Sequence, residues 1–459
     1  MPLVKVANPL TFSGSQAPLG QQCIGRSFSS LFPSLTNTKL DLASIIETFA
    51  PPLAQFESLY KDIHQHPDLS CSEGRTSSII ADRLQDLGFD VRESIGGHGV
   101  VGVLQNGPGK VVMLRAELDA LPIQEQTGLS FSSTKRMADM WGRDQPVMHA
   151  CGHDMHMACL VAAAKLLHDA RSTWAGTLEV LFQPNEEHTG GAQSMIDDGL
   201  YEKIPKPDVI MAQHLMQIPS GTLSVKSGPV LVSADTVKLR VFSSEGYVAN
   251  PQVSVEISVV ISKVVLRLQD LVKEVSKDGY ASIHVEELHI GAPGLDWAEY
   301  ADVVLDVKAY DPGLRSRLLD GINSIVEDES TASGAAKKPC ITSSVRAPLT
   351  NNDGHLADRV GQVFAEFFGA DKVLQAVPSH PCEDFSILAR AVQSPYLFWF
   401  LGRVHPEDLD RARRDGNVLD KIPIEHSAFN APLIHPTLET GMKALSVAAL
   451  SFLTEDNTC

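Results

Sequence analysis

The stretch from His149 to His156 holds the densest group of potential metal ligands in the sequence. It reads His-Ala-Cys-Gly-His-Asp-Met-His, so five of its eight residues carry an imidazole, a thiol or a carboxylate. Cys and His are common ligands of borderline-soft divalent metals. Cys151 and His153 are two residues apart, a spacing that suits a tight turn better than one face of a helix. We therefore predict a metal-binding turn; a capped turn with a buried structural His is the simpler alternative.

Two adjacent carboxylates, Glu186 and Glu187, follow a predicted strand over residues 177–182 and precede a pair of glycines. Adjacent side chains in an extended chain point in opposite directions, so we expect the two to have different roles. One can bind a metal while the other faces the substrate, holds a water and acts as a general base. For the pair considered alone, a solvated acidic loop is the alternative.

Two further imidazoles lie in polar segments far along the chain. His214 follows a predicted strand over residues 209–212, and His426 precedes a predicted last helix over residues 438–452, with His435 as a nearby alternative. Each of them alone would be more typical of a structural His. Together with the residues above they complete a set of five ligands for two metals that share a water: Cys151, His153, Glu187, His214 and His426.

The elements that must position these residues alternate between strands and helices. Apolar strands are expected at 99–104, 111–114, 177–182 and 209–212, and an apolar helix follows the ligand-rich turn over 157–167. This alternation is typical of an α/β layered domain with a largely parallel sheet. Because ligands bind at the carboxyl ends of strands in such sheets, the polar strand ends and the Cys151 turn are interpreted as one site. These ends carry Glu117 with Asp119, Glu186 with Glu187, and Gln213 with His214.

The pattern of polar and apolar residues changes between residues 234 and 345. Strands that alternate polar and apolar residues are expected at 237–242, 282–290 and 302–310, and helices at 253–275 and 311–328. This order predicts a small α+β unit whose sheet has one solvent-facing side. We interpret 234–345 as an insertion into a metal-binding catalytic domain formed by 41–233 and 346–459. Residues 1–40 are expected to be a loosely ordered extension.

Composition and charge narrow the class of protein. The 459 residues are 43% hydrophobic and carry a formal net charge of −18, which argues against nucleic acid and anionic membranes as partners. No apolar run reaches the roughly 18 residues of a membrane span. Seven irregularly spaced cysteines do not indicate a disulfide framework, so we predict a reducing compartment, the cytoplasm. Because the first 40 residues contain no Asp or Glu, an organellar location is the alternative.

These motifs together resemble the metal-dependent aminoacylase, carboxypeptidase and amidohydrolase family, whose members include hippurate hydrolases and plant auxin–amino acid conjugate hydrolases. The resemblance covers roughly residues 55–455 and rests on segments 64–70, 115–122, 149–156, 182–187, 383–386 and 426–429. It implies that the five ligands named above hold a pair of metal ions and that Glu186 is the general base. It also implies that Glu117 and Asp119 support the ligands from behind, and that the insertion is a lid that forms a homodimer.

The chain departs from the family pattern at positions expected to face the substrate. Tyr247 stands where the family has a substrate-contacting His, and Lys308 where it has an Arg for the substrate carboxylate. A family Asn-x-Ile-Pro turn is replaced at about Leu295 and Ala298, and Glu117 stands in place of the usual Asp. Lys cannot form the bidentate fork of Arg, and Tyr cannot become a cation near neutral pH. Either Tyr247 and Lys308 bind the substrate in a new way, or the substrate differs.

The sequence therefore predicts a dinuclear metal-dependent amidohydrolase that cleaves an N-acyl amino acid or a related small-molecule conjugate. Zn²⁺ or Mn²⁺ is expected, with Co²⁺ or Ni²⁺ as alternatives, because sites of imidazole and carboxylate accept all four. One alternative is a specialised enzyme of secondary metabolism that hydrolyses or forms a C–N bond in a substrate without a free carboxylate. Another is a non-catalytic metal-binding homologue.

Overall fold

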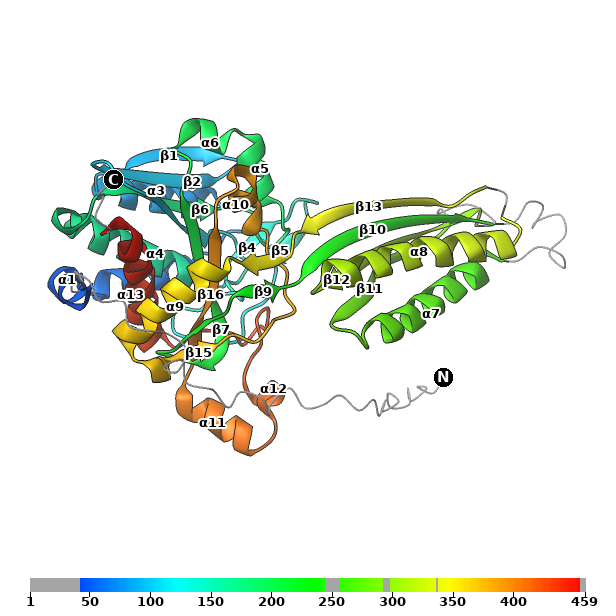
Figure 1. The fold of residues 1–459 in the computed structure, drawn as a ribbon. Helices are drawn as coiled ribbons and strands as arrows, with labels where there is room; N and C mark the ends of the chain where they lie inside the picture. Colours follow the sequence, from blue (N-terminus) through cyan, green and yellow to red (C-terminus); the bar gives the residue numbers. More distant parts are fainter. Residues whose placement is uncertain (1–41, 244–255, 292–297, 336, 455–459) are drawn as a thin grey trace.

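The chain folds into a layered α/β unit and an elongated α+β unit that projects from it (Figure 1). The structure is a computed structural model that describes residues 42–243, 256–291, 298–335 and 337–454. One sheet is large and mostly parallel, and the second is separate and antiparallel. The fold class predicted from the sequence is thereby confirmed.

The α/β unit is built on an eight-stranded sheet in the order β1-β2-β6-β3-β7-β16-β8-β15. Its strands, in chain order, are β1 (Asp90–Ile95), β2 (Gly99–Asn106), β3 (Val111–Glu117), β6 (Gly176–Gln183), β7 (Val209–Pro219), β8 (Leu223–Val225), β15 (Val373–Gln375) and β16 (Tyr396–Val404). The central strands β6, β3, β7 and β16 are parallel neighbours. Every residue of β6 is buried, as expected for a strand covered on both faces of a sheet.

Helices cover both faces of this sheet. One face packs against α1 (Leu42–Phe49), α2 (Ala54–Gln65), α3 (Gly74–Asp86), α4 (His153–Asp169), α9 (Gly354–Phe368) and α13 (Ile434–Leu453). The other face packs against α5 (Gly191–Asp197), α6 (Leu200–Lys203) and α10 (Ser386–Val392). Helix α4 is apolar on nearly all sides, and for that reason it lies buried between the sheet and its neighbouring helices. Its first residue is His153, so the buried helix begins at the predicted ligands.

The projecting unit is a four-stranded antiparallel sheet in the order β11-β12-β10-β13, with two helices packed on it (Figure 1). Its elements are β10 (Ser233–Phe242), α7 (Ile257–Val275), β11 (Ala281–Ile290), β12 (Tyr300–Ala309), α8 (Pro312–Ala332) and β13 (Cys340–Ala347). Alternate residues of β10 and β12 point into a core of Val, Ile and Leu shared with both helices. From His284 onward β11 is exposed rather than alternating, because it forms an edge of the sheet.

Several short elements surround the rim of the large sheet. They are the hairpin β4 (Arg136–Ala138) and β5 (Asp144–Pro146), the pair β9 (Gly228–Leu231) and β14 (Thr350–Asn352), and the helices α11 (Pro406–Arg414) and α12 (Val418–Lys421). One expectation was wrong in detail. His214 lies inside β7 rather than after it, because β7 continues to Pro219 beside β16. Across the ranges that the structure describes, no helix is long and apolar enough to cross a membrane.

Candidate metal centre

The Cys151 turn is shaped by Gly152. This glycine has φ 87° and immediately precedes α4, so the chain reverses sharply between Cys151 and His153. A Cβ atom at this position would lie 2.5 Å from Cδ1 of Leu215 on β7. Both the positive φ and this close approach require glycine. The turn therefore places the thiol and the first imidazole of α4 at the carboxyl end of the sheet.

Backbone carbonyls fix the protonation of two imidazoles. Nδ1 of His153 donates to the carbonyl of Asp119 at 2.8 Å, and Nδ1 of His214 donates to the carbonyl of Leu215 at 2.8 Å. A carbonyl can only accept, so in each neutral ring the lone pair is on Nε2. This is the tautomer that a metal ligand needs. Nε2 of His214 lies 3.4 Å from Sγ of Cys151.

The five predicted ligands converge in two overlapping sets. The ligand atoms of Cys151, His153 and His214 lie within 4.8 Å of one another, and so do those of Cys151, Glu187 and His426. Cys151 belongs to both sets. Nε2 of His426 lies 3.2 Å from Glu187, and its backbone N–H donates to the carbonyl of Ala150 at 3.1 Å.

Unpaired buried atoms in this cluster fit a bound cation. Nε2 of His153, Oε1 of Glu187 and Oδ1 of Asp119 are buried and have no hydrogen-bond partner. Buried polar atoms in folded proteins are nearly always paired, so the unpaired Nε2 of His153 and Oε1 of Glu187, which lie 3.8 Å apart, call for a ligand between them. Thiolate, imidazole and carboxylate together are a donor set that divalent transition metals accept. The residues present therefore fit a metal site.

Asp119 supports the cluster from behind. Its Oδ2 accepts hydrogen bonds from the hydroxyl of Ser70 at 2.7 Å and from the backbone N–H of Glu187 at 3.0 Å, and its backbone carbonyl holds His153. Glu117 has a different contact. It accepts from Nδ1 of His156 at 2.7 Å and pairs with Arg115. Because Nε2 of His156 accepts from the backbone N–H of Leu215, both nitrogens of that ring are already engaged.

The other members of the ligand-rich stretch are not in either set that shares Cys151. Asp154 lies 2.6 Å from Nδ1 of His64, whose Nε2 lies 3.1 Å from Glu125. Burial opposes the charge of His64, but these two carboxylates raise its pKa to about 10, so they hold a buried imidazolium between α2 and α4. His149 is buried with both ring nitrogens unpaired, and burial lowers its pKa to about 4. It is therefore a neutral ring at ordinary pH.

Glu186 lies in a tight turn after β6 and not in extended chain as expected. Asn185 has φ 52°, and the backbone N–H groups of Gly190 and Gly191 donate to the carbonyl of Asn185. Glu186 is only 6% exposed, and its Oε2 lies 3.8 Å from Nε2 of His153. Burial raises the pKa of Glu186 well above its usual range, and the neighbouring carboxylates of Glu383 and Glu187 raise it further.

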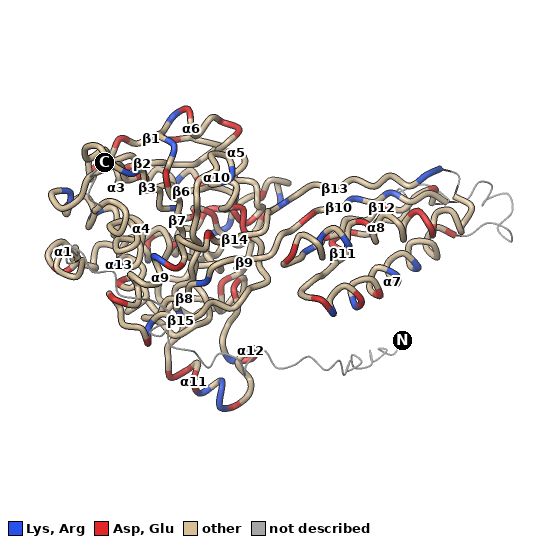
Figure 2. Tube along the Cα trace, viewed as in Figure 1, with Lys and Arg blue, Asp and Glu red and all other residues tan. Residues whose placement is uncertain are grey.

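A buried Arg network beside Glu186 had no role assigned from the sequence. Arg115 donates to Glu383 at 2.8 Å and to the side-chain oxygen of Gln183 at 2.8 Å, and Gln183 in turn donates to Asp384 at 2.6 Å. Figure 2 shows acidic residues gathered in this region, beside β14. The polar residues at the end of β3 could have indicated Arg115, which lies within that strand, but Glu383 is 268 residues away in sequence and only the fold brings it close.

The structure describes one of the two predicted substrate-binding residues, Lys308. Lys308 lies at the base of the projecting unit, on β12, where its Nζ is 3.1 Å from Asp306. Arg346 of β13 pairs with the same carboxylate. Tyr247, like the altered turn near Leu295, lies outside the described residues.

Comparison with known proteins agrees with this arrangement. The chain is 32% identical to the hippurate hydrolase of Campylobacter jejuni over 75% of its own length and 87% of the relative. It is 28% identical to IAA-amino acid hydrolase ILR1-like 2 of Arabidopsis thaliana, covering 82% and 84%. The crystal structure of Bacillus subtilis YxeP, described as a dinuclear metal-binding peptidase, superposes with a TM-score of 0.70 at 22% identity, covering 89% of this chain and 99% of that one.

A family profile spans most of the chain. Residues 113–413 match peptidase family M20/M25/M40, and this range includes both acidic pairs and the whole Cys151 turn. The relatives include hydrolases of amide and peptide bonds. This chain belongs to the metal-dependent amidohydrolases and peptidases of family M20/M25/M40.

Proposed function

We propose that this chain is a dinuclear metal-dependent amidohydrolase in which Glu186 is the general base. The observation that carries the proposal is the convergence of two ligand sets on the sulfur of Cys151, with the carboxylate of Glu186 3.8 Å from the unpaired Nε2 of His153. Glu186 is outside both of those sets, and its carboxylate lies within 4.8 Å of the ligand atoms of His153 and Glu187, where it could exchange a proton with a water at the cluster.

The proposed ligands divide between two cations. One would be held by Cys151, His153 and His214, and the other by Cys151, Glu187 and His426. Zn²⁺ or Mn²⁺ suits these donors, and Co²⁺ or Ni²⁺ would also be accepted. When bound, such cations polarise the substrate carbonyl and lower the pKa of water to about 7.

Glu186 moves the proton in the proposed reaction. Its carboxylate takes a proton from the water that attacks the amide carbon and returns it to the nitrogen as the C–N bond breaks, leaving a carboxylic acid and an amine. Burial of Glu186 favours proton uptake, and its position beside Glu383 and Asp384 favours it further, because like charges stabilise the protonated form. Arg115 holds Glu383 in place from the opposite side.

The proposed substrate is an N-acyl amino acid or a related small-molecule conjugate. Two relatives are named for the hydrolysis of hippurate and of IAA–amino acid conjugates, which are amides of amino acids. We also propose that 41–233 and 346–459 form the catalytic domain and that 234–345 is a lid through which two copies pair. Exposed apolar side chains on the edge strand β11 support this pairing, among them Leu288 and Ile290.

Substituting Glu186 and Glu187 one at a time distinguishes the proposed roles of these two carboxylates. Glu186→Gln is expected to lower kcat by about 10²–10⁴-fold on N-acyl amino acids while both metals stay bound, because only the proton carrier is lost. Glu187→Gln is expected to lower metal content, because it removes a ligand. Metal content is measured by atomic emission, and turnover by mass spectrometry over a library of N-acyl amino acids. Full activity of Glu186→Gln would remove that residue from the mechanism.

A second candidate function follows from the contacts of Lys308. Its ammonium lies 3.1 Å from Asp306, a carboxylate that also pairs with Arg346, so Lys308 already has an ion-pair partner within the lid with which a substrate carboxylate would compete. This favours a substrate without a free carboxylate, and an enzyme that cleaves or forms such a C–N bond. Paired assays with N-acyl amino acids and their primary amides decide between the two: a higher kcat/KM on the amides supports this second candidate, and a strong preference for the acids contradicts it.

A further inference from the structure

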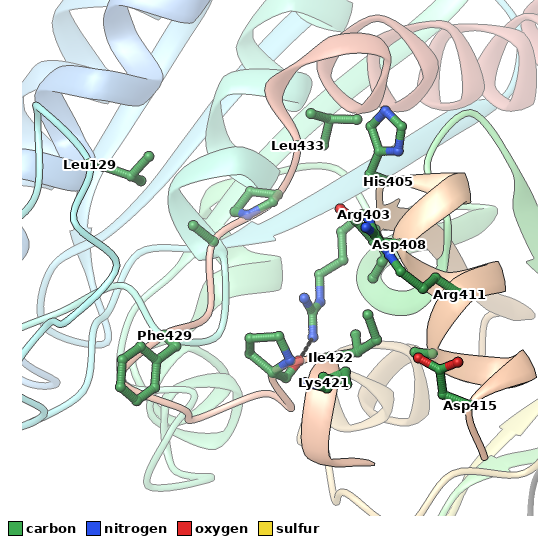
Figure 3. A pocket seen from close by; sticks show the side chains of 15 residues that line it. Leu129, Arg403, His405, Asp408, Arg411, Asp415, Lys421, Ile422, Phe429 and Leu433 are labelled. Atoms are coloured by element: carbon green, nitrogen blue, oxygen red, sulfur yellow. Dashed lines mark hydrogen bonds and ion pairs between the residues drawn. The ribbon is translucent and has the colours of Figure 1, made fainter. Parts of the chain in front are cut away.

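A cavity of about 650 Å³ lies beside the candidate metal centre, between the loop that follows α12 and the helix α11. Figure 3 shows the side chain of Arg403 extending through its middle, with Leu129 and Phe429 on one side and residues of α11 on the other. The volume is in the range of sites for small organic molecules. None of the five proposed metal ligands lines it.

Arg403 carries a buried charge that is only partly balanced. The side chain is at the end of β16 and is 3% exposed. One terminal nitrogen donates to the carbonyl of Pro423 at 2.5 Å and lies 3.5 Å from Glu425, while Nε is buried without any partner. Burial lowers the pKa of this guanidinium despite the nearby Glu425. A buried cation in this situation is stabilised by a further anion that accepts from it.

The remaining lining is basic on one side and apolar on the other. Arg411, Lys421 and His405 line the side of α11 and α12, with Arg411 paired to Asp408 and with Asp415 nearby. The facing wall includes Leu129 and Phe429, and Leu433 lies beside His405. Because two carboxylates share the cavity with these cations, a monoanion is favoured over a dianion such as phosphate.

The cavity and the metal cluster share one loop. Pro423 and Phe429 line the cavity, while His426 between them faces the cluster through Glu187. Arg403 holds this loop from the cavity side through Pro423 and through its own carbonyl, which accepts from the backbone N–H of Leu433 at 2.9 Å. A ligand bound to Arg403 would therefore contact the same loop that positions His426.

We propose that this cavity binds a monocarboxylate with an apolar body, an aryl or medium-chain alkanoic acid, through Arg403. The apolar body packs on Leu129 and Phe429, and the carboxylate accepts from the guanidinium of Arg403. This site is separate from the metal centre, so the inference does not depend on the proposed hydrolytic function.

The test is titration of the metal-replete protein with octanoate, octanamide and inorganic phosphate by isothermal calorimetry. Octanoate is expected to bind, and octanamide and phosphate to bind much more weakly. Arg403→Met should weaken octanoate binding by roughly tenfold or more, because the buried partner of the carboxylate is lost. Arg403→Met could also disturb the His426 loop, because Arg403 holds that loop. Arg411→Met and Lys421→Met change cavity residues that do not hold the loop, and each is expected to weaken octanoate binding.

Two controls accompany these variants. Arg413→Met removes a charge from the same helix, where Arg413 pairs with Asp410 and does not line the cavity, so octanoate binding should be unchanged. The native protein after removal of metal by a chelator should also bind octanoate unchanged, which excludes carboxylate bound at the metals. The proposal is overturned if octanamide or phosphate binds as tightly as octanoate, if octanoate does not bind, if Arg413→Met weakens binding as much as Arg411→Met, or if binding disappears when the metals are removed.

Discussion

At the scale of single residues, the candidate centre depends on imidazole nitrogens that do not hydrogen-bond to the backbone. The carbonyls of Asp119 and Leu215 accept from Nδ1 of His153 and His214, and the Nε2 atoms, which hold the lone pair when the rings are neutral, face Cys151 and the acidic pair. His156 is only three residues from His153, yet both its nitrogens are engaged by Glu117 and Leu215. Hydrogen bonding, rather than residue type, therefore separates candidate ligands from structural imidazoles.

Replacing the shared sulfur tests the two ligand sets together. Cys151→Ser is expected to weaken binding of both metals by at least roughly 10–100-fold, because a Ser hydroxyl is a poor ligand at neutral pH. This is the loss of affinity that follows when only a hydrogen-bond partner of a ligand is removed, and here a ligand itself is lost. Metal affinity is measured by competition with a chelator of known affinity. Cys159→Ser is the matched control, because Cys159 is buried on α4, the helix that follows the Cys151 turn, and contacts Leu438 instead. Equal metal binding by both variants would show that Cys151 is not a ligand.

At the scale of elements, β6 contains an unusual buried acid. Glu179 is fully buried, neither carboxylate oxygen has a hydrogen-bond partner, and its neighbours on the sheet are Val103 and Met113. Burial alone raises its pKa to about 8. Between its usual pKa and this value the folded state binds a proton that the unfolded state releases, so the contribution of Glu179 to stability decreases as the pH rises.

Glu179→Gln is expected to remove this pH dependence. The variant should gain stability relative to the native chain as the pH rises from about 5 to 8, by up to ~1.4 kcal/mol per pH unit, because Gln never ionises. Urea unfolding at several pH values measures the difference, in which effects common to both proteins cancel. Glu202→Gln, on the exposed surface of α6, is the control and should track the native chain. A constant difference across the pH range would contradict the prediction.

The elements of the fold were largely predictable from local pattern. Both sheets were predicted from the periodicity of the strands, from the apolar helix after the Cys151 turn and from the change in the pattern of polar and apolar residues near residue 234. The extent of β7 was not predictable, because its last residues are held by pairing with β16, which lies far along the chain. The short helices α11 and α12 were missed for a similar reason, since few of their residues are apolar and these pack in a small cluster with Val404 and Ile422, while Leu419 is exposed.

The candidate site was predictable to the level of which residues lie together, and no further. Polar residues at the ends of parallel strands indicated that Cys151, Glu187 and His214 would converge, and they do; their role as ligands stays a prediction. The partners of these residues follow no local pattern. Arg115 with Glu383 and His64 with Asp154 join segments that only tertiary packing brings close.

At the scale of the whole molecule, the projecting unit presents an open sheet edge. Residues of β11 beyond Ile283 are exposed, and Leu288 and Ile290 are each 45% exposed. An edge strand with exposed apolar side chains is a template for pairing with another chain. This edge runs along one side of the projecting unit and begins at its base, where Ala281 pairs with Ala309 (Figure 1).

We predict that this edge joins two chains. Light scattering of the metal-replete protein should give the mass of two chains, and Leu288→Lys with Ile290→Lys should give the mass of one, because two charges at the edge oppose pairing. Leu419→Lys, at an exposed site on α12, is the control and should leave the mass unchanged. A single-chain mass for the native protein, or a double mass for the edge variant, would contradict the proposed dimer.

The position of Cys151 in both ligand sets has a consequence for how the enzyme would fail. In the proposed centre, one oxygen atom transferred to this sulfur removes a ligand from both cations in a single event. Peroxide would then inactivate the enzyme as this one thiol is oxidised, and no intermediate that retains only one of the two metals would accumulate. A thiol reductant would reverse the damage only while the sulfur is a sulfenic acid, and further oxidation would make it permanent.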